Sequence, residues 1–207
     1  ASLLSAALEA EAVELWTDIE GIMTADPSKV KHYFVIPHLS YEEAMELSHF
    51  GAKVVYPPSL QPAMKANIPI LIKNTFKPDE EGTRISEESL PGPSIIKGIS
   101  SIDNITLLTV RGSGIIGVTG ISARLFGAMA DAGINIIMIT QASSEHTISV
   151  AVLPGQTEAA QQAIENEFRY ELRDDVINDV KVENELSIVA VVSDDMRCKP
   201  GVSGRVF

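Results

Sequence analysis

The sequence is poor in cysteine, in basic residues and in long apolar runs. One cysteine among 207 residues, Cys198, excludes an intramolecular disulfide framework and is typical of a reducing cytoplasm. The formal net charge of −12 disfavours nucleic acid and anionic membranes as partners, because both are bound by basic patches. No apolar run is long enough to span a bilayer, and the N-terminus lacks the basic segment of a signal peptide. We therefore expect a cytoplasmic protein without a membrane segment.

Residues that could bind a metal ion are also sparse. The four histidines are scattered, with no cysteine or carboxylate at ligand spacing, so we expect no metal site built from protein side chains. The length allows one large or two small domains with a buried core. Because the first residue is Ala1 and not methionine, we expect a chain cut from a longer protein.

Two short segments near the N-terminus have the composition of ligand-binding loops. Residues 16–27 and 50–57 each place small, turn-forming and charged residues beside a short apolar stretch. This pattern is typical of a strand or helix that leads into a loop holding a ligand. Taken singly, Asp26-Pro27 could be an ordinary turn, and Lys53 could be a solvated lysine near a helix C-terminus. In this order, with a helix between them, the two segments indicate a binding site.

Hydrophobic periodicity and turn residues predict the elements of the first part of the chain. These are a helix over 2–12, a strand over 13–16, a helix over 41–50 and a strand over 68–72. Ser40 and Glu43 have the spacing of a capping box at the start of the second helix. Residues 75–94, rich in proline, glycine and acidic residues, are predicted to form a domain boundary.

A β-α-β-β-α-β series follows, which is the ferredoxin-like plan. The predicted elements are strands over 105–110, 134–140, 146–153 and 180–182, and helices over 119–132 and 157–172. Gly133 is predicted to end the first of these helices. The run 134–139 is too apolar to face water, so we expect it to be buried by helices and a partner.

The chain also repeats itself. Shifted by 81 positions, Ile105–Phe126 aligns with Leu186–Phe207 without a gap. Gly120 then falls on Gly201, and apolar positions fall on apolar positions. We interpret this as a second copy of the unit that stops partway through its first helix.

Segments 16–27 and 50–57 together resemble the nucleotide-binding part of aspartokinases, which phosphorylate the side-chain carboxylate of aspartate with ATP. The β-α-β-β-α-β unit, with Gly117, Gly120, Asn135 and the run 139–145, resembles an ACT domain, a small regulatory module that binds amino acids. Aspartokinases carry two such domains, one inserted into the other. The runs 96–104 and 139–145 look most like bifunctional aspartokinase/homoserine dehydrogenases, whose kinase responds to threonine.

The resemblance implies an α/β (α+β) fold. Residues 1–74 would be the C-terminal piece of an amino-acid-kinase domain, with 68–74 expected to supply a strand to the second ACT unit. A linker over 75–98 would lead to a first ACT domain over 99–185 and the start of a second, truncated one over 186–207.

The resemblance also implies where a nucleotide binds, as ATP with Mg²⁺ held through the phosphates. The implied contacts are Thr17, Asp18, Met23, Ser28, Lys53 and Val54. The family commonly has tyrosine in place of Met23 and arginine in place of Ser28. Because serine lacks the bidentate, charged grip of a guanidinium on phosphate, we expect Lys53 to be the main cation there, with Lys29 as a partial substitute.

An amino-acid effector presents a carboxylate and an ammonium group. The glycine-rich loop 112–120 leads into a helix N-terminus and offers backbone N–H groups to a carboxylate. Asn135 and Gln141 can donate and accept, and therefore suit the ammonium or a side-chain hydroxyl. Gln141 could instead bond its own backbone, and Asn135 could be a turn residue. The expected effector site comprises Gly117, Val118, Gly120, Ile121, Asn135 and Gln141.

The leading hypothesis is part of an aspartokinase regulated by threonine, with lysine as the alternative effector and a homodimer formed through the ACT domains. The family's Lys-Phe-Gly-Gly-Thr-Ser start and glycine-rich phosphate loop are not in the sequence, so we expect this chain alone to be inactive. A non-catalytic module that senses an amino acid is the second hypothesis. Another amino-acid kinase is disfavoured, because the ACT repeat follows the kinase piece.

Overall fold

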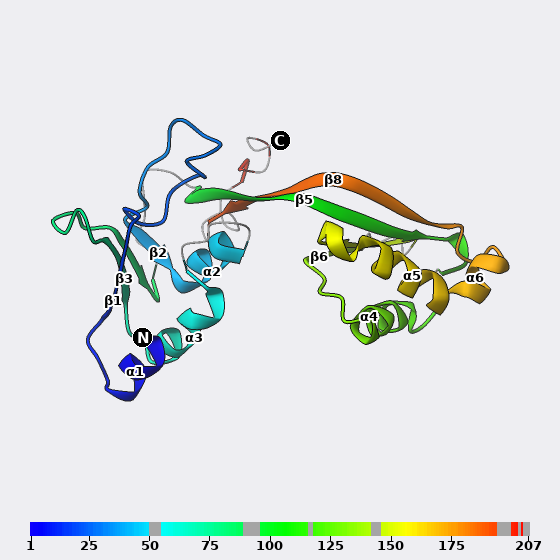
Figure 1. Ribbon diagram of the computed structural model, residues 1–207, viewed down its shortest axis with the longest axis horizontal. Helices are drawn as coiled ribbons and strands as arrows, with labels where there is room; N and C mark the ends of the chain where they lie inside the picture. The colour runs from blue at the N-terminus through cyan, green and yellow to red at the C-terminus, as the bar shows by residue number, and fades with distance from the viewer. Residues whose placement is uncertain are drawn as a thin grey trace. The chain divides into compact units, whose positions relative to one another are not determined.

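The computed structural model describes residues 1–49, 55–88, 96–115, 118–141, 146–193, 200–202 and 204. The chain divides into a first unit, Ala1–Ile102 with Val189–Phe207, and a second unit, Asp103–Ile188. The strands form two four-stranded sheets, and Figure 1 labels the helices and most of these strands. The predicted mixed α/β fold class is confirmed.

The first sheet has the strand order β1-β3-β4-β2. The strands are β1 (Val13–Thr17), β2 (His38–Ser40), β3 (Ile70–Asn74) and β4 (Thr83–Ser86). β1 runs parallel to β3, and β4 runs antiparallel to β3 and parallel to β2. The helices α2 (Tyr41–His49) and α3 (Pro57–Lys65) bury Leu47 and Leu60 in the core that the sheet residues Ile70, Ile72 and Ile85 share. The short helix α1 (Ser2–Ala7) contacts α3.

Two expectations for this region are wrong. Residues 68–74 do not supply a strand to a second ACT unit, because β3 is paired on one edge by β1 and on the other by β4. β4 itself lies inside the predicted linker. Its Thr83 and Ile85 are fully buried, and Gly82, at φ +71°, turns the chain back so tightly that a Cβ there would meet the Ile72 carbonyl oxygen.

Local signals in the first unit were more reliable. The predicted capping box is confirmed: the Ser40 N–H donates to Glu43 Oε2 and the Glu43 N–H donates to Ser40 Oγ, both at 3.0 Å. The N-terminal helix is shorter than predicted. It ends at Ala7, and Glu9 adopts φ +51°, which is incompatible with a continuing right-handed helix.

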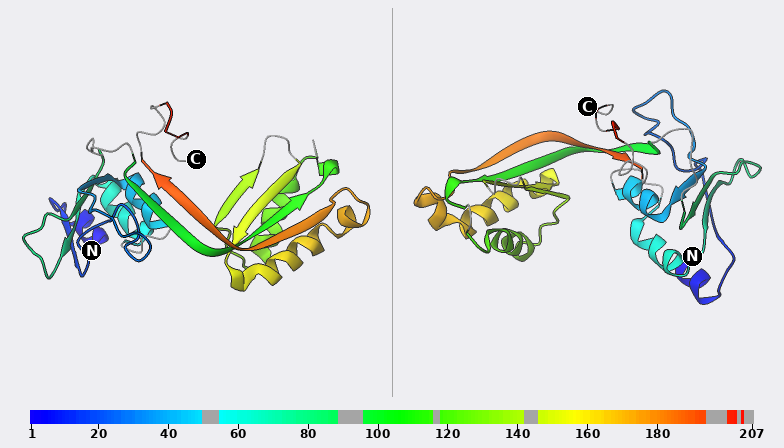
Figure 2. Two further views of the ribbon diagram at one scale, coloured as in Figure 1. Left: turned by 90° about the horizontal axis from the view of Figure 1, so that it is seen from above. Right: turned by 180° about the vertical axis from the view of Figure 1, so that it is seen from behind.

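The second sheet has the order β6-β7-β5-β8, the ferredoxin-like arrangement that the sequence predicts. Its strands are β5 (Gly98–Arg111), β6 (Met138–Gln141), β7 (Thr147–Val152) and β8 (Asp179–Val192). The helices α4 (Ile121–Asp131) and α5 (Thr157–Glu167) pack on one face, as Figure 2 shows. Leu125 and Ile164 meet the inward-facing residues of β5 and β7, such as Leu108 and Val150. A short 3-10 turn, Pro154–Gln156, precedes α5.

Three details of the second unit differ from the sequence predictions. The helix over 157–172 is interrupted at Phe168, which is fully buried, and α6 (Arg169–Arg173) continues beyond it. The short strand over 180–182 is part of the 14-residue β8. The run 134–139 leads into β6 at the sheet edge, where Ile139 is 53% exposed and therefore not buried within this chain.

The internal repeat has a structural counterpart. Gly120 and Gly201, which the repeat aligns, adopt left-handed φ values of +90° and +85°. The residue after each glycine, Ile121 or Val202, is 6% exposed in both copies. Within the described ranges, no helix has the length and apolar character required to cross a membrane.

Candidate functional site

Thr17 and Asp18 lie where parallel sheets commonly bind ligands. Thr17 and Asn74 are the last residues of β1 and β3 and are register partners in this parallel pair, so both strands end at the same edge. Ligands of open α/β sheets bind outside the carboxyl ends of the strands. The Thr17 hydroxyl donates to Asp18 Oδ1 at 3.1 Å, which orders the first residues of the loop that follows β1.

The loop 17–20 is fastened to the turn 74–77, and we call these two segments the edge cluster. The Thr75 N–H donates to the Thr17 carbonyl at 2.8 Å. The Asn74 side chain, 6% exposed, donates to the Asp18 carbonyl at 3.4 Å and accepts from the Phe76 N–H at 2.7 Å. Lys77 forms an ion pair with Glu20. Three contacts therefore hold the segment after β1 against the segment after β3, and the bond from the Phe76 N–H to Asn74 lies within the turn.

The loop that carries Met23 and Ser28 is closed at its base by Thr83. Met23 forms a bridge with Val35, and the Ile36 N–H donates to the Ile22 carbonyl at 2.8 Å. Thr83 Oγ1, fully buried, accepts from the Ile22 N–H at 2.8 Å and donates to the Ile36 carbonyl at 2.7 Å. One hydroxyl thus joins both ends of the loop that carries Met23.

Ser28 has a structural role in this loop. Its N–H and its hydroxyl both donate to Asp26 Oδ1, at 2.8 and 2.7 Å, and these bonds lower the pKa of the Asp26 carboxyl. Lys29, suggested by the sequence as a substitute phosphate ligand, donates from Nζ to Ser101 Oγ at 2.7 Å. The proton of the Ser28 hydroxyl is therefore engaged by Asp26, while Lys29 anchors the loop to β5.

Three of the predicted site residues, Lys53, Val54 and Gly117, lie outside the described residues. Around Gly117, the described part of the effector loop is tightly packed. The Gly112 N–H donates to the His146 carbonyl at 3.1 Å, and a Cβ at Gly112 would lie 2.3 Å from the Val176 carbonyl oxygen. A 3-10 turn, Ser113–Ile115, follows, and the Gly114 N–H donates to the Val176 carbonyl at 3.2 Å.

The effector loop ends at the N-terminus of α4. Gly120 is the N-cap residue and has no side chain to satisfy the first N–H groups of the helix. Val118 is 51% exposed, whereas Ile121 is buried against the core. This end of α4 therefore offers backbone donors of the kind that bind a carboxylate.

The structure brings Gln141 to the effector loop but places Asn135 elsewhere. Gln141 pairs with Ile148, and Ile148 pairs with Val110 at the end of β5 that leads into the loop. Asn135 lies just before the other end of β6. It is six residues from Gln141, and six residues of extended chain span up to about 20 Å. Both residues are exposed. One small amino acid cannot contact both within a single copy of this unit.

Local sequence patterns do not indicate the cluster that fixes α4. Arg124 Nε donates to Glu167 Oε1 at 2.7 Å, and a second guanidinium nitrogen donates to Glu171. The guanidinium carbon lies 4.7 Å from the centre of the Phe168 ring. Hydrogen bonding from Arg124 lowers the pKa of Glu171. Arg124 thus joins α4 to α5 and α6 and fixes the direction of the α4 N-terminus.

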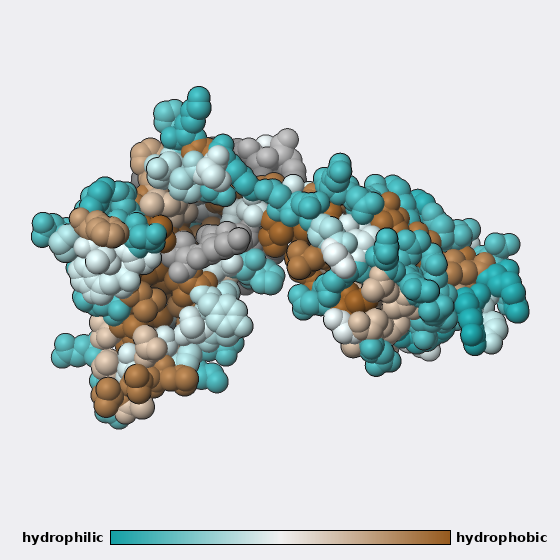
Figure 3. Space-filling view, in the orientation of Figure 1, coloured by the Kyte–Doolittle hydropathy of each residue, from teal (hydrophilic) through white to brown (hydrophobic). Residues whose placement is uncertain are grey.

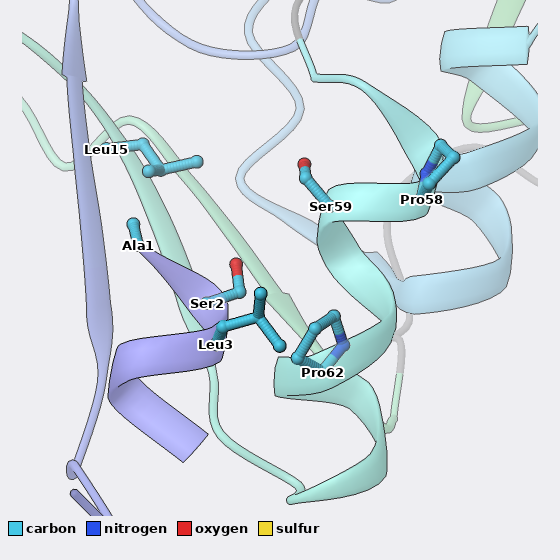
Figure 4. Close-up of a pocket in the computed structure, with 7 residues that line it drawn as sticks. All are labelled: Ala1, Ser2, Leu3, Leu15, Pro58, Ser59 and Pro62. Atoms are coloured by element: carbon cyan, nitrogen blue, oxygen red, sulfur yellow. The ribbon is translucent and has the colours of Figure 1, made fainter. Parts of the chain in front are cut away.

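An apolar pocket of about 330 Å³ lies apart from these sites, between α1 and α3. Figure 4 shows its lining, which is Ala1, Ser2, Leu3, Leu15, Pro58, Ser59 and Pro62. These side chains include no titratable group. The exposed leucines of α1 contribute to the hydrophobic surface over this helix in Figure 3. We assign no chemistry to this pocket.

Comparisons with known proteins match both segments of the chain. A model of the amino acid kinase family matches residues 1–74, and a model of the ACT domain matches residues 108–168. The bifunctional aspartokinase/homoserine dehydrogenase of Haemophilus influenzae is 42% identical over 207 residues, which are all of this chain and 25% of that protein. The chain therefore spans about a quarter of the length of this relative.

Solved aspartokinases have the same fold. Aspartate kinase of Clostridium acetobutylicum matches all of this chain with a TM-score of 0.86 and 25% identity, over 47% of its own length. Escherichia coli aspartokinase III with aspartate and ADP (R-state) matches all of it with a TM-score of 0.80 and 30% identity, over 45% of its length. The same enzyme with lysine and aspartate (T-state) matches with a TM-score of 0.74 and 30% identity. This match covers 95% of this chain and 42% of that one. The chain belongs to the aspartokinase family, with an amino-acid-kinase segment followed by an ACT segment.

Proposed function

We propose that the protein carrying this chain is an ATP-dependent aspartokinase. It would transfer the γ-phosphoryl group of MgATP to the side-chain carboxylate of L-aspartate, giving 4-phospho-L-aspartate, the first step toward lysine, threonine and methionine. The observation that carries this proposal is the edge cluster, which places Thr17 and Asp18 at the carboxyl ends of β1 and β3. The ADP and aspartate bound to the E. coli relative support it.

Phosphoryl transfer depends mainly on positioning and on neutralising phosphate charge. Thr17 and Asp18 would contact the nucleotide from the edge cluster, and Met23 from the loop that Thr83 closes. Because Ser28 and Lys29 are engaged within the protein, Lys53 is the cation that we assign to the phosphates, with Val54 beside it. Mg²⁺ would be held through the phosphates. The cytoplasm is the compartment that we propose for this reaction.

Lys53→Ala tests the assignment of the phosphate cation. Losing a charge-assisted contact costs about 1.5–3 kcal/mol, so the KM for ATP should rise roughly ten- to hundredfold while effector affinity stays unchanged. Lys65→Ala, in the last turn of α3, is the matched control and should leave the KM for ATP unchanged. Equal values for wild type and Lys53→Ala would remove Lys53 from the site.

We further propose that the ACT segment binds an amino-acid effector between two copies of the chain. β6 is an edge strand, and an exposed edge favours pairing with another copy. If two β6 strands pair antiparallel about a two-fold axis, Asn135 of one copy comes beside Gln141 and the effector loop of the other. This arrangement supports a homodimer whose effector takes its contacts from both copies.

Threonine is the effector that we favour, since a curated relative with 42% identity to this chain is a bifunctional aspartokinase/homoserine dehydrogenase. Lysine is the alternative, supported by the lysine bound to E. coli aspartokinase III. Inhibition curves with each amino acid decide between them: the tighter inhibitor is the effector, and a tighter lysine contradicts the threonine assignment.

A complementation experiment tests the shared site. Asn135→Ala and Gln141→Ala should each weaken inhibition, by about 0.5–1.5 kcal/mol per lost hydrogen bond. In a mixed dimer of the two variants, one of the two sites keeps both side chains. Each mixed dimer should therefore bind the effector tightly at one of its two sites, and a mixture without such tight sites would contradict an effector site shared between two copies. A protein that binds the amino acid but never turns over ATP would support the alternative, a non-catalytic sensor.

A further inference from the structure

The edge cluster carries a large apolar side chain that no part of the proposed mechanism has used. Phe76 lies in the turn after β3 and is 80% exposed, more than any other large apolar side chain in the described residues. A single exposed apolar residue is common on protein surfaces and carries no inference by itself. Phe76 differs because it is anchored among the residues that we assign to the nucleotide.

The backbone of Phe76 is held rigidly. Its N–H donates at 2.7 Å to the Asn74 side chain, and Asn74 is buried and also bonds the Asp18 carbonyl. The preceding N–H, of Thr75, donates to the Thr17 carbonyl. The next residue, Lys77, is paired with Glu20. Asn74, Thr75 and Lys77 are thus bonded directly to the loop that carries Thr17 and Asp18, and the Phe76 backbone is tied to this loop through Asn74.

This construction has the chemistry of a nucleotide-base site. The loop 17–20 supplies polar groups, and the exposed ring of Phe76, in the turn bonded to this loop, supplies an apolar face at the edge where α/β sheets bind ligands. A nucleotide carries a planar base that stacks on aromatic side chains, whereas its phosphates require charge. Aspartate has no such apolar surface.

We propose that Phe76 is the stacking partner of the base of the bound nucleotide, with Asn74 as the positioning residue that fixes the ring beside Thr17 and Asp18. The proposal rests on the ATP-dependent function proposed above and adds a residue that recognises the base. Asn74 acts through Phe76 and the Asp18 backbone, and does not itself contact the nucleotide.

The test compares ligands with and without a base, using the protein that carries this chain. Affinities for ATP and for inorganic tripolyphosphate are measured for wild type, Phe76→Ala, Phe76→Tyr and Leu8→Ala. Leu8 is 77% exposed and lies in the same unit, so it controls for the removal of an exposed apolar side chain. Phe76→Ala should weaken ATP about five- to a hundredfold and leave tripolyphosphate unchanged. Phe76→Tyr keeps the ring and should bind ATP as wild type does, as should Leu8→Ala.

The outcomes separate this proposal from the function on which it rests. If wild type binds no ATP, the proposed function itself fails. If wild type binds ATP and Phe76→Ala binds it equally well, only the role of Phe76 is overturned. A variant that loses ATP and tripolyphosphate to the same extent also overturns it, because that result indicates a phosphate contact or a disturbed fold.

Discussion

Thr83 is the residue on which the order of the candidate nucleotide loop depends most. Its hydroxyl is fully buried, accepts from the Ile22 N–H at 2.8 Å and donates to the Ile36 carbonyl at 2.7 Å. Thr83→Val keeps the shape of the side chain but leaves one buried donor and one buried acceptor without this partner. Each such group costs about 1–3 kcal/mol, so we expect a loss of roughly 2–6 kcal/mol in the free energy of unfolding.

Thr24→Val is the matched control. Thr24 Oγ1 also accepts a backbone N–H from the same loop, that of Phe34 at 3.0 Å, but this bond is exposed. Because water can replace the hydroxyl there, the loss should stay below about 1 kcal/mol. Thr83→Ser keeps the hydroxyl and loses one methyl group, which costs about 0.8 kcal/mol.

Urea unfolding followed by tryptophan fluorescence measures these differences. The chain has one tryptophan, Trp16, which lies in β1 and therefore reports on the first unit. Amide exchange at Ile22 reports on the broken bond directly and should accelerate in Thr83→Val. Equal destabilisation by Thr83→Val and Thr24→Val would refute the assigned role of the buried hydroxyl.

Three further predictions concern the capping box, the Arg124 cluster and the effector site. Ser40→Ala should lower the free energy of unfolding by about 1 kcal/mol through loss of the cap of α2, measured in urea, and an unchanged midpoint would contradict it. Hydrogen bonding from Arg124 lowers the pKa of Glu171 from its usual 4.5. The pairing therefore stabilises the folded state above pH 4.5, and this stabilisation is lost as the pH falls through the folded-state pKa. Thermal unfolding between pH 3 and 7 should therefore show less acid destabilisation in Arg124→Gln than in wild type, and parallel curves would contradict the pairing. Gln141→Ala should raise the inhibitory threonine concentration several-fold with uninhibited turnover unchanged, as expected for one lost hydrogen bond of about 0.5–1.5 kcal/mol, whereas overlapping inhibition curves would make Gln141 a strand-end residue only.

Much of the fold could be predicted from local patterns. The capping box at Ser40, the stop at Gly133 and the buried face of α4 each depend on residues close together in sequence. The partner of β3 could not be predicted this way, because an apolar strand has the same pattern whichever sheet receives it. β4 was missed because its four residues follow a run of turn-forming and acidic residues.

The site residues also divide into those with a local sequence signal and those that depend on contacts far along the chain. Thr17 and Asp18 have a local signal, since turn-forming residues follow a short strand. Asn74, Thr83 and Arg124 position the site through contacts with residues 43 to 61 positions away, which periodicity does not detect. The edge position of β6 likewise depends on strand order, so the apolar pattern of its run could not show that Ile139 is exposed within a single chain.

Trapping the acyl phosphate tests the central claim most directly. The protein carrying this chain is incubated with MgATP, L-aspartate and hydroxylamine, which converts an acyl phosphate to a hydroxamate. We predict hydroxamate formation that requires both ATP and aspartate and that falls as threonine is added. Formation of no hydroxamate above a heat-inactivated control, while the protein still binds threonine, would contradict the assignment as an aspartokinase and leave an amino-acid sensor.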